Sequence, residues 1–283
     1  MIQVIRPVNL LLMAFLQAMV LLNLGAYNYL FYDPFKTLFL ISGTALIAAA
    51  GYIINDYFDV KIDLINKPGR VFIGTRISRR WAIILHVTFT AAGLLLTWLV
   101  NLKVAGIAAL CAALLYFYSS SFKKKFLLGN LVIALLSALS VLICYFYISE
   151  LYIEKILAYS FFAFISTLLR EIVKDQEDAA GDELFQSKSL AISLGLRKTK
   201  RIVLFTTIMF ILSLFLYVAT LPPDENAFYR PYVYGVFLLL GVALPMIYFI
   251  RLLLPADKSS DFARLSRILK WVIFSGIASM LFA

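Results

Sequence analysis

The chain has 283 residues, of which 63% are hydrophobic, 15% are aromatic and only 15% are charged, and its mean hydropathy is +0.91. Soluble domains carry about 25% charged residues, so this composition excludes a soluble globular protein and indicates an integral membrane protein. The formal net charge of +10 would suit a nucleic-acid-binding protein, but the distribution of the basic residues along the chain argues against that class.

Nine apolar runs along the chain are candidate transmembrane helices. A helix needs about 17–25 mainly apolar residues to cross the hydrocarbon core of a membrane. The runs cover approximately residues 9–30, 35–56, 81–100, 104–121, 127–149, 152–171, 202–220, 232–253 and 265–282. We therefore predict an all-α polytopic membrane protein, with nine transmembrane helices in a bundle around a central cavity and a single domain over residues 1–283. Arg6 and Pro7 lead directly into a long apolar stretch with no small-residue cleavage site, so we expect the first helix to be retained.

The basic residues concentrate in alternate loops between these runs. With the amino terminus in the cytoplasm, 22 of the 26 Lys and Arg residues fall on the cytoplasmic side, and the exceptions are Lys36, Lys103, Lys155 and Arg230. This asymmetry follows the positive-inside rule. We predict a multi-pass protein of the cell (inner) membrane with its amino terminus in the cytoplasm. The positive charge then reports topology, and we expect no nucleic-acid partner.

Two segments, at the polar ends of the second and sixth runs, carry the same spacing of carboxylates. The first has Asn55 followed by Asp56, Asp59 and Asp63, and the second has Asp175, Asp178 and Asp182. On a helix, the offsets i, i+3 and i+7 fall within an arc of about 60°, so three like charges would repel one another. Mg²⁺ prefers oxygen ligands and is often held by carboxylates together with substrate phosphates. The alternative is a pair of solvated helix ends; we predict a magnesium–diphosphate site facing the cytoplasm.

Basic residues near these two segments are candidates for binding phosphate. Lys67 and Arg70 follow the first segment, Lys123 follows the fourth run, and Arg170 and Lys174 flank the second segment. Fixed Lys and Arg donors stabilise the charge that develops on a leaving diphosphate. Topology alone would also supply basic residues here. We predict that Lys67, Arg70 and Lys123 contact phosphate directly.

These motifs together make the chain similar to the UbiA superfamily of intramembrane prenyltransferases. The matching residues are Arg6-Pro7-x-Asn9, the two carboxylate segments, the loop Asn66-Lys67-Pro68-x-Arg70 and the stretch from Tyr118 to Lys123. Within the superfamily, the stretch from Arg170 to Asp182 most resembles the digeranylgeranylglyceryl phosphate synthase branch. One departure is Arg70-Val71-Phe72-Ile73-Gly74, where many members read Arg-Pro-x-x-Ser-Gly.

The resemblance implies Mg²⁺-dependent transfer of a polyprenyl group, geranylgeranyl in that branch, from its diphosphate to a lipophilic acceptor in the bilayer. The catalytic set it implies is Asp56, Asp59, Asp175, Asp178, Lys123 and Tyr118, with Asn55, Asp63 and Asp182 also near the metal. Asn9 and Arg6 are expected to orient donor or acceptor.

Two questions stay open at this stage. Arg170 and Lys174 could bind the phosphate of geranylgeranylglyceryl phosphate, or they could serve only the donor and leave an aromatic acceptor such as a quinone precursor or a porphyrin-type ring. A cation transporter is a different class of protein that also places carboxylates in a bundle. Its acids usually lie near mid-membrane, whereas here they lie at helix ends.

Overall fold

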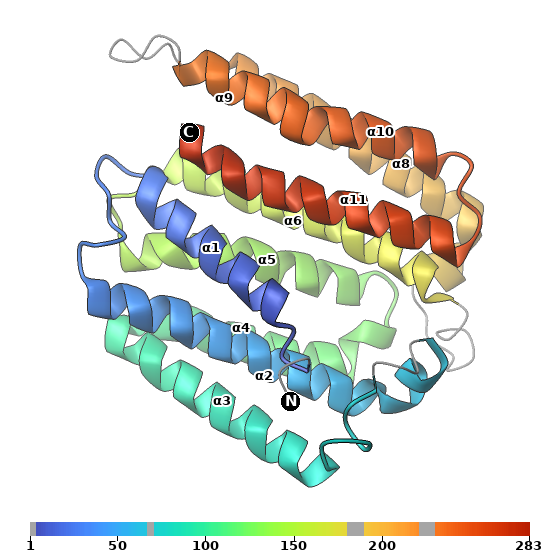
Figure 1. Ribbon diagram of the computed structural model, residues 1–283, viewed down its shortest axis with the longest axis horizontal. Helices are drawn as coiled ribbons and strands as arrows, with labels where there is room; N and C mark the ends of the chain where they lie inside the picture. Colours follow the sequence, from blue (N-terminus) through green and yellow to red (C-terminus); the bar gives the residue numbers. More distant parts are fainter. Residues whose placement is uncertain (1–3, 67–70, 180–189, 221–229) are drawn as a thin grey trace.

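The computed structural model describes residues 4–66, 71–179, 190–220 and 230–283, and nearly all of them are helical (Figure 1). The α-helices are α1 (Pro7–Asn23), α2 (Pro34–Asn66), α3 (Arg79–Val100), α4 (Leu102–Ser120), α5 (Leu128–Tyr147), α6 (Ile153–Glu177), α8 (Leu190–Ala219), α9 (Arg230–Leu238), α10 (Leu244–Leu253) and α11 (Ser259–Ala278). Three short turns complete the set: the 3₁₀ helices η2 (Phe122–Lys124) and η4 (Ser279–Phe282), and the π-helical segment η3 (Leu239–Ala243).

The predicted all-α membrane bundle is confirmed. Within the described residues, eight helical segments are long and apolar enough to cross a membrane. The predicted first span corresponds to α1, which has 17 residues and ends at Asn23 rather than at 30. The predicted eighth span is α9, η3 and α10 joined end to end, with the π-helical turn ending two residues before Pro245. Proline lacks a backbone N–H donor, which explains why the regular helical pattern is interrupted there.

The helices that carry the two carboxylate segments extend beyond their apolar runs. α2 continues past the predicted end at 56 to Asn66, and α6 continues past 171 to Glu177. The last turns of α2, α4, α6 and α10 gather at the right-hand end of the bundle (Figure 1). Both carboxylate segments therefore lie at the same end of the molecule, as the alternation of loops predicts.

Each of these two helices is held by several neighbours. α2 packs against α1, α3 and α4, while α6 packs against α5, α8 and α11; α1 also contacts α5 and α11. α2 and α3 cross closely because glycines face each other: a Cβ added to Gly43 would lie 3.0 Å from the carbonyl oxygen of Gly93. Small residues at helix crossings are typical of membrane bundles, where close van der Waals packing replaces the hydrophobic effect.

A second close contact joins three helices through one buried amide. Gln17 on α1 has no exposed surface; its Nε2 donates to the Ser140 carbonyl of α5 at 3.4 Å, and its Oε1 accepts from Thr44 Oγ1 of α2 at 2.9 Å. A polar side chain in the membrane must be satisfied by protein groups. This bond pattern fixes α1 between α2 and α5.

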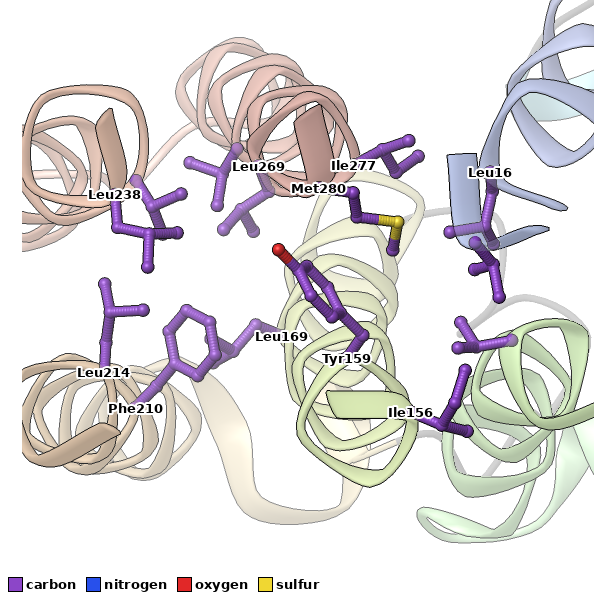
Figure 2. Close-up of a cluster of buried hydrophobic side chains, with 14 of the residues drawn as sticks. Leu16, Ile156, Tyr159, Leu169, Phe210, Leu214, Leu238, Leu269, Ile277 and Met280 are labelled. Carbon is purple, nitrogen blue, oxygen red and sulfur yellow. The ribbon is translucent and has the colours of Figure 1, made fainter. Parts of the chain in front are cut away.

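The apolar core that positions α6 lies between α6, α8, α9 and α11 (Figure 2). Tyr159 of α6 points into this core toward Leu238, while Phe210 and Leu214 fill the α8 side and Met280 the opposite side. The Tyr159 hydroxyl is hydrogen bonded to Tyr234 at 3.0 Å. Packing along this helix holds its far end, with the second carboxylate segment, in a fixed position.

Candidate active site

The first carboxylate segment has the helical geometry that its spacing predicts. Asp56, Asp59 and Asp63 all lie within α2, on its last turns. Asp59 is only 4% exposed and the Asp56 side chain is 17% exposed, so both carboxylates turn toward the protein. Burying carboxylates costs free energy unless each has a charged or hydrogen-bonding partner.

Arg6 is the partner of Asp56. Its Nη2 lies 2.7 Å from Asp56 Oδ1, and its guanidinium stacks over the ring of Tyr52 at 4.9 Å from the ring centre. Arg6 has φ 51°, a left-handed conformation that is uncommon outside glycine and needs support from its surroundings. Val4 supplies that support, because it is 2% exposed and packs in a small cluster that includes Ile53 of α2. The amino-terminal segment thus brings Arg6 to the first carboxylate segment.

Lys123 is the partner of Asp59. The Lys123 ammonium in η2 forms a salt bridge with Asp59 Oδ2, and Asn55 Nδ2 donates to the same oxygen at 2.8 Å. Burial alone would lower the pKa of Lys123, but the Asp59 carboxylate outweighs it and the pKa is raised. Lys123 is therefore a fixed cation at neutral pH. The structure brings together three residues that the sequence analysis selected.

The second carboxylate segment departs from the expected helical geometry. Asp175 lies in the last turn of α6, but the helix ends at Glu177 and Asp178 is its C-cap, with φ −95° and ψ 3°. Asp182 lies outside the described residues, as do Lys67 and Arg70. Helical spacing therefore does not fix the direction of Asp178.

Asn130, at the start of α5, is a site residue that the sequence analysis missed. Its side chain is buried, and its Nδ2 donates to Asp175 Oδ2 at 2.8 Å. The available signal was a single amide at the polar end of an otherwise apolar run. An amide in that position is often a helix-packing group, so the sequence alone did not distinguish the two roles.

The two carboxylate segments belong to one site because Tyr118 interacts electrostatically with acids of both. Tyr118, in the last turn of α4, lies within electrostatic range of Asp59 on α2 and of Asp175 and Glu171 on α6, as well as of Lys123. Four elements, α2, α4, η2 and α6, thus contribute charged or polar groups to a common volume.

Glu171 is the second residue that the sequence analysis did not select. It is 8% exposed, its Oε1 accepts from Arg170 Nη1 at 2.7 Å, and its Oε2 lies 3.7 Å from Lys174 Nζ. It also lies within electrostatic range of Arg6 and Lys123. Arg170 and Lys174, both expected near substrate, are therefore organised around one buried carboxylate.

Asn9 is also brought to this end of the molecule. Its side chain interacts with the Tyr52 hydroxyl on α2. Arg79, at the start of α3, contacts a different tyrosine of α2: its guanidinium stacks over Tyr57 at 4.3 Å from the ring centre. Asn9 and Arg6 therefore both lie beside Tyr52, and their role in orienting donor or acceptor stays a prediction.

The side chains at this end of the bundle are of the chemical type that binds Mg²⁺. The first segment and Asp175 offer only oxygen ligands, which Mg²⁺ prefers, and the nearby amides of Asn55 and Asn130 can orient them. Within the described residues, no three acidic, His or Cys side chains form a metal-binding group; Asp56 and Asp59 are each paired with a cation. The ligand chemistry fits, and the assignment of individual ligands stays a prediction.

Comparison with protein families and curated proteins gives a consistent result. The model of the UbiA prenyltransferase family matches residues 9–274. Digeranylgeranylglyceryl phosphate synthase from Methanothermobacter thermautotrophicus is 31% identical over 269 residues, which cover 95% of this chain and 90% of that protein. The enzyme of the same name from Sulfurisphaera tokodaii is 35% identical over 167 residues, and there the match covers 59% of this chain and only 60% of that protein's length.

Solved structures agree with the fold. A structure reported for digeranylgeranylglyceryl phosphate synthase in membranes superposes with a TM-score of 0.67 at 26% identity, covering 98% of this chain and 96% of that one. A UbiA homolog from Archaeoglobus fulgidus, bound to GPP and Mg²⁺, has a TM-score of 0.64 at 15% identity over 98% of both chains, which supports the fold alone. The chain therefore belongs to the UbiA prenyltransferase family of multi-pass membrane enzymes.

Proposed function

We propose that this protein transfers a geranylgeranyl group from geranylgeranyl diphosphate to the free hydroxyl of geranylgeranylglyceryl phosphate, within the membrane and with Mg²⁺. The observation that carries the proposal is the convergence of both carboxylate segments with Lys123 and Tyr118 at one end of the bundle. The names of the relatives support the choice of substrates.

The donor diphosphate would lie between the ends of α2 and α6. The residues proposed to hold Mg²⁺ are Asp56, Asp59, Asp63, Asp175, Asp178 and Asp182, assisted by Asn55. When bound, the metal would neutralise the diphosphate and make it a better leaving group. Lys123 would then exchange part of its interaction with Asp59 for a phosphate oxygen, and Lys67 and Arg70 would add further positive charge. Arg6 and Asn9 would orient the donor from the α1 side.

The prenyl chain would extend from the diphosphate into the apolar interior. Loss of diphosphate leaves an allylic cation, which water would capture if it had access. Tyr118, in the last turn of α4, would line the boundary between the charged end and the apolar interior. An aromatic ring in this position can stabilise a nearby cation through its π face.

The acceptor phosphate would bind Arg170 and Lys174. Both side chains are directed to Glu171 and remain about 30% exposed, at 27% and 31%, so each has donors left for a phosphate. An aromatic acceptor of the kinds considered above carries no phosphate for this pair of cations to bind. This supports the glycerol phosphate acceptor over a quinone precursor or a porphyrin-type ring.

The site would face the cytoplasm of a cell membrane. The end of the bundle that carries both carboxylate segments also carries Lys123, Lys124 and Lys125, in keeping with the positive-inside rule. The whole of residues 1–283 would act as a single catalytic domain.

The test is an assay on purified protein with Mg²⁺, labelled geranylgeranyl diphosphate and a panel of acceptors, with products identified by mass. We expect one ether product, formed from geranylgeranylglyceryl phosphate and lost on chelation of the metal. A prenylated aromatic product in its place would overturn the acceptor assignment. Magnesium flux through proteoliposomes without any prenyl transfer would overturn the enzymatic proposal and support a transporter.

A further inference from the structure

Glu171 lies deeper in the bundle than the carboxylates proposed to hold the metal. It precedes Asp175 by four residues on α6, which places it about 6 Å further from the helix end and within about 40° of the same face. A carboxylate that is 8% exposed in a membrane helix is costly to maintain, and intramembrane acids are functional candidates for that reason.

On the other helix, Tyr52 likewise precedes Asp56 by four residues, so it lies about 6 Å further from the end of α2. Tyr52 lies within electrostatic range of Glu171 and of Arg170, and Tyr118 lies within electrostatic range of Glu171. Glu171 thus interacts with a tyrosine on each of two other helices, and we refer to Tyr52, Tyr118 and Glu171 together as the inner layer. In this layer Glu171 is the carboxylate, and so the strongest proton acceptor.

The reaction chemistry requires a proton acceptor at this depth. The reacting carbon is joined to the diphosphate on one side and to the apolar chain on the other, so it lies inward of the phosphates. Ether formation at that carbon also removes a proton from the acceptor hydroxyl, and a general base must be within hydrogen-bond reach of that proton.

We propose that Glu171 is the general base that accepts the proton of the acceptor hydroxyl, an inference that rests on the function proposed above. In this step the bond between the allylic carbon and the diphosphate oxygen breaks, and its electron pair leaves with the diphosphate. A lone pair of the acceptor hydroxyl oxygen forms the new carbon–oxygen bond. The hydroxyl proton passes to a carboxylate oxygen of Glu171 and then to solvent or to the released diphosphate.

The two ion pairs of Glu171 are compatible with this role. Arg170 binds one carboxylate oxygen and Lys174 approaches the other, which leaves lone pairs free on both oxygens. These cations make Glu171 a weaker base, but the oxygen of a forming ether is strongly acidic once it has bonded to the cation, so a weak base suffices. If Arg170 and Lys174 bind the acceptor phosphate, the acceptor hydroxyl would lie next to the Glu171 carboxylate, which is between the two cations.

The test separates ionisation of the donor from capture by the acceptor. In the Glu171→Gln variant the donor would still bind and ionise, while ether formation would fall by about 10²–10⁴-fold for loss of a general base. When the donor carries ¹⁸O in the bridging position, reversible cleavage of the carbon–oxygen bond moves the label to non-bridging positions of the diphosphate. The rate of this label exchange in the variant should stay within about tenfold of the rate in the native enzyme. Part of the donor would be released as the prenyl alcohol. The Glu171→Asp variant, which keeps a base, would recover part of the ether formation.

The matched control is the Glu177→Gln variant, which replaces another carboxylate on the same helix. The backbone carbonyl of Glu177, which the substitution keeps, accepts a hydrogen bond from Ser259 Oγ at 2.8 Å. This variant should form ether at the native rate. Native ether formation by Glu171→Gln would overturn the proposal and leave the proposed function intact. Loss of donor binding and of label exchange in both Glu171 variants would also overturn it, by assigning Glu171 to the donor site. If the native enzyme forms no ether at all, the proposed function itself fails.

Discussion

Lys123 is the cation that balances Asp59, a carboxylate with almost no exposed surface. The Lys123→Met variant removes the charge and keeps much of the side-chain length. We expect turnover to fall by about 10²–10³-fold, because a fixed donor to the developing phosphate charge is lost. The variant should also unfold at a lower temperature in detergent, because the buried Asp59 carboxylate loses its salt bridge and keeps a hydrogen bond from Asn55, a neutral group. Turnover of labelled donor and thermal unfolding measure the two effects.

Lys124 provides the matched control, because it is the next residue in η2 and its side chain is exposed. The Lys124→Met variant should keep turnover within about twofold and leave the unfolding temperature unchanged, since exposed charges contribute little. Equal losses in both variants would mean that the general positive charge of the segment matters, rather than the contact with Asp59.

At the residue scale, the sequence predicted which acidic residues lie together, but not which residues form ion pairs or hydrogen bonds with them. The i, i+3, i+7 spacing is a local pattern, and α2 turns it directly into one helical face. The pairing of Arg6 with Asp56 joins residues far apart in the chain and depends on a left-handed backbone at Arg6, which no periodic pattern encodes. The hydrogen bond from Asn130 to Asp175 likewise depends on how α5 packs against α6.

At the scale of the elements, the crossing of α2 and α3 depends on backbone contact at Gly43 and Gly93. A Cβ at position 93 would lie 2.7 Å from a side-chain carbon of Ile47 and 2.8 Å from the Gly43 oxygen. We expect Gly93→Val to destabilise the fold by about 1–3 kcal/mol through overpacking. Because α2 carries the first carboxylate segment, turnover should fall as well. The unfolding temperature in detergent and the turnover of labelled donor are the measurements.

Gly106 on α4 is the control for this prediction, because nothing lies within 4 Å of a Cβ built there. The Gly106→Ala variant should be as stable as the native protein or slightly more so, since alanine favours helix more than glycine does. An unchanged unfolding temperature for Gly93→Val would show that the two helices can separate without cost, contrary to the packing described.

Hydropathy predicted where the helices lie, but it did not predict the residues at which they end. Long apolar runs have few alternatives to helix in a membrane, so each predicted span contains a helix. The ends of α2 and α6 extend into polar sequence, where hydropathy carries no signal and helical hydrogen bonding decides. The π-helical turn in the eighth span depends on how the chain accommodates Pro245, which a window of apolar residues does not register.

At the scale of the whole molecule, the last turns of α2, α4, α6 and α10 share one end of the bundle, and the starts of α2, α4 and α6 lie at the other (Figure 1). Lys125 lies at the first end, just beyond η2, and Lys103 lies near the start of α4 at the opposite end; both side chains are exposed. These two lysines therefore report which end faces the cytoplasm.

We expect the end that carries the site to face the cytoplasm, because 22 of the 26 basic residues lie on that side of the predicted topology. Lys103→Cys and Lys125→Cys would each be made in a background with Cys111 and Cys144 replaced by Ala. A membrane-impermeant thiol reagent on intact cells should label Lys103→Cys and leave Lys125→Cys unlabelled until the cells are opened. The reverse pattern would place the carboxylate segments outside the cell, away from a cytoplasmic supply of diphosphate donor. Labelling of both variants in intact cells would mean a mixed orientation, which the strong charge asymmetry argues against.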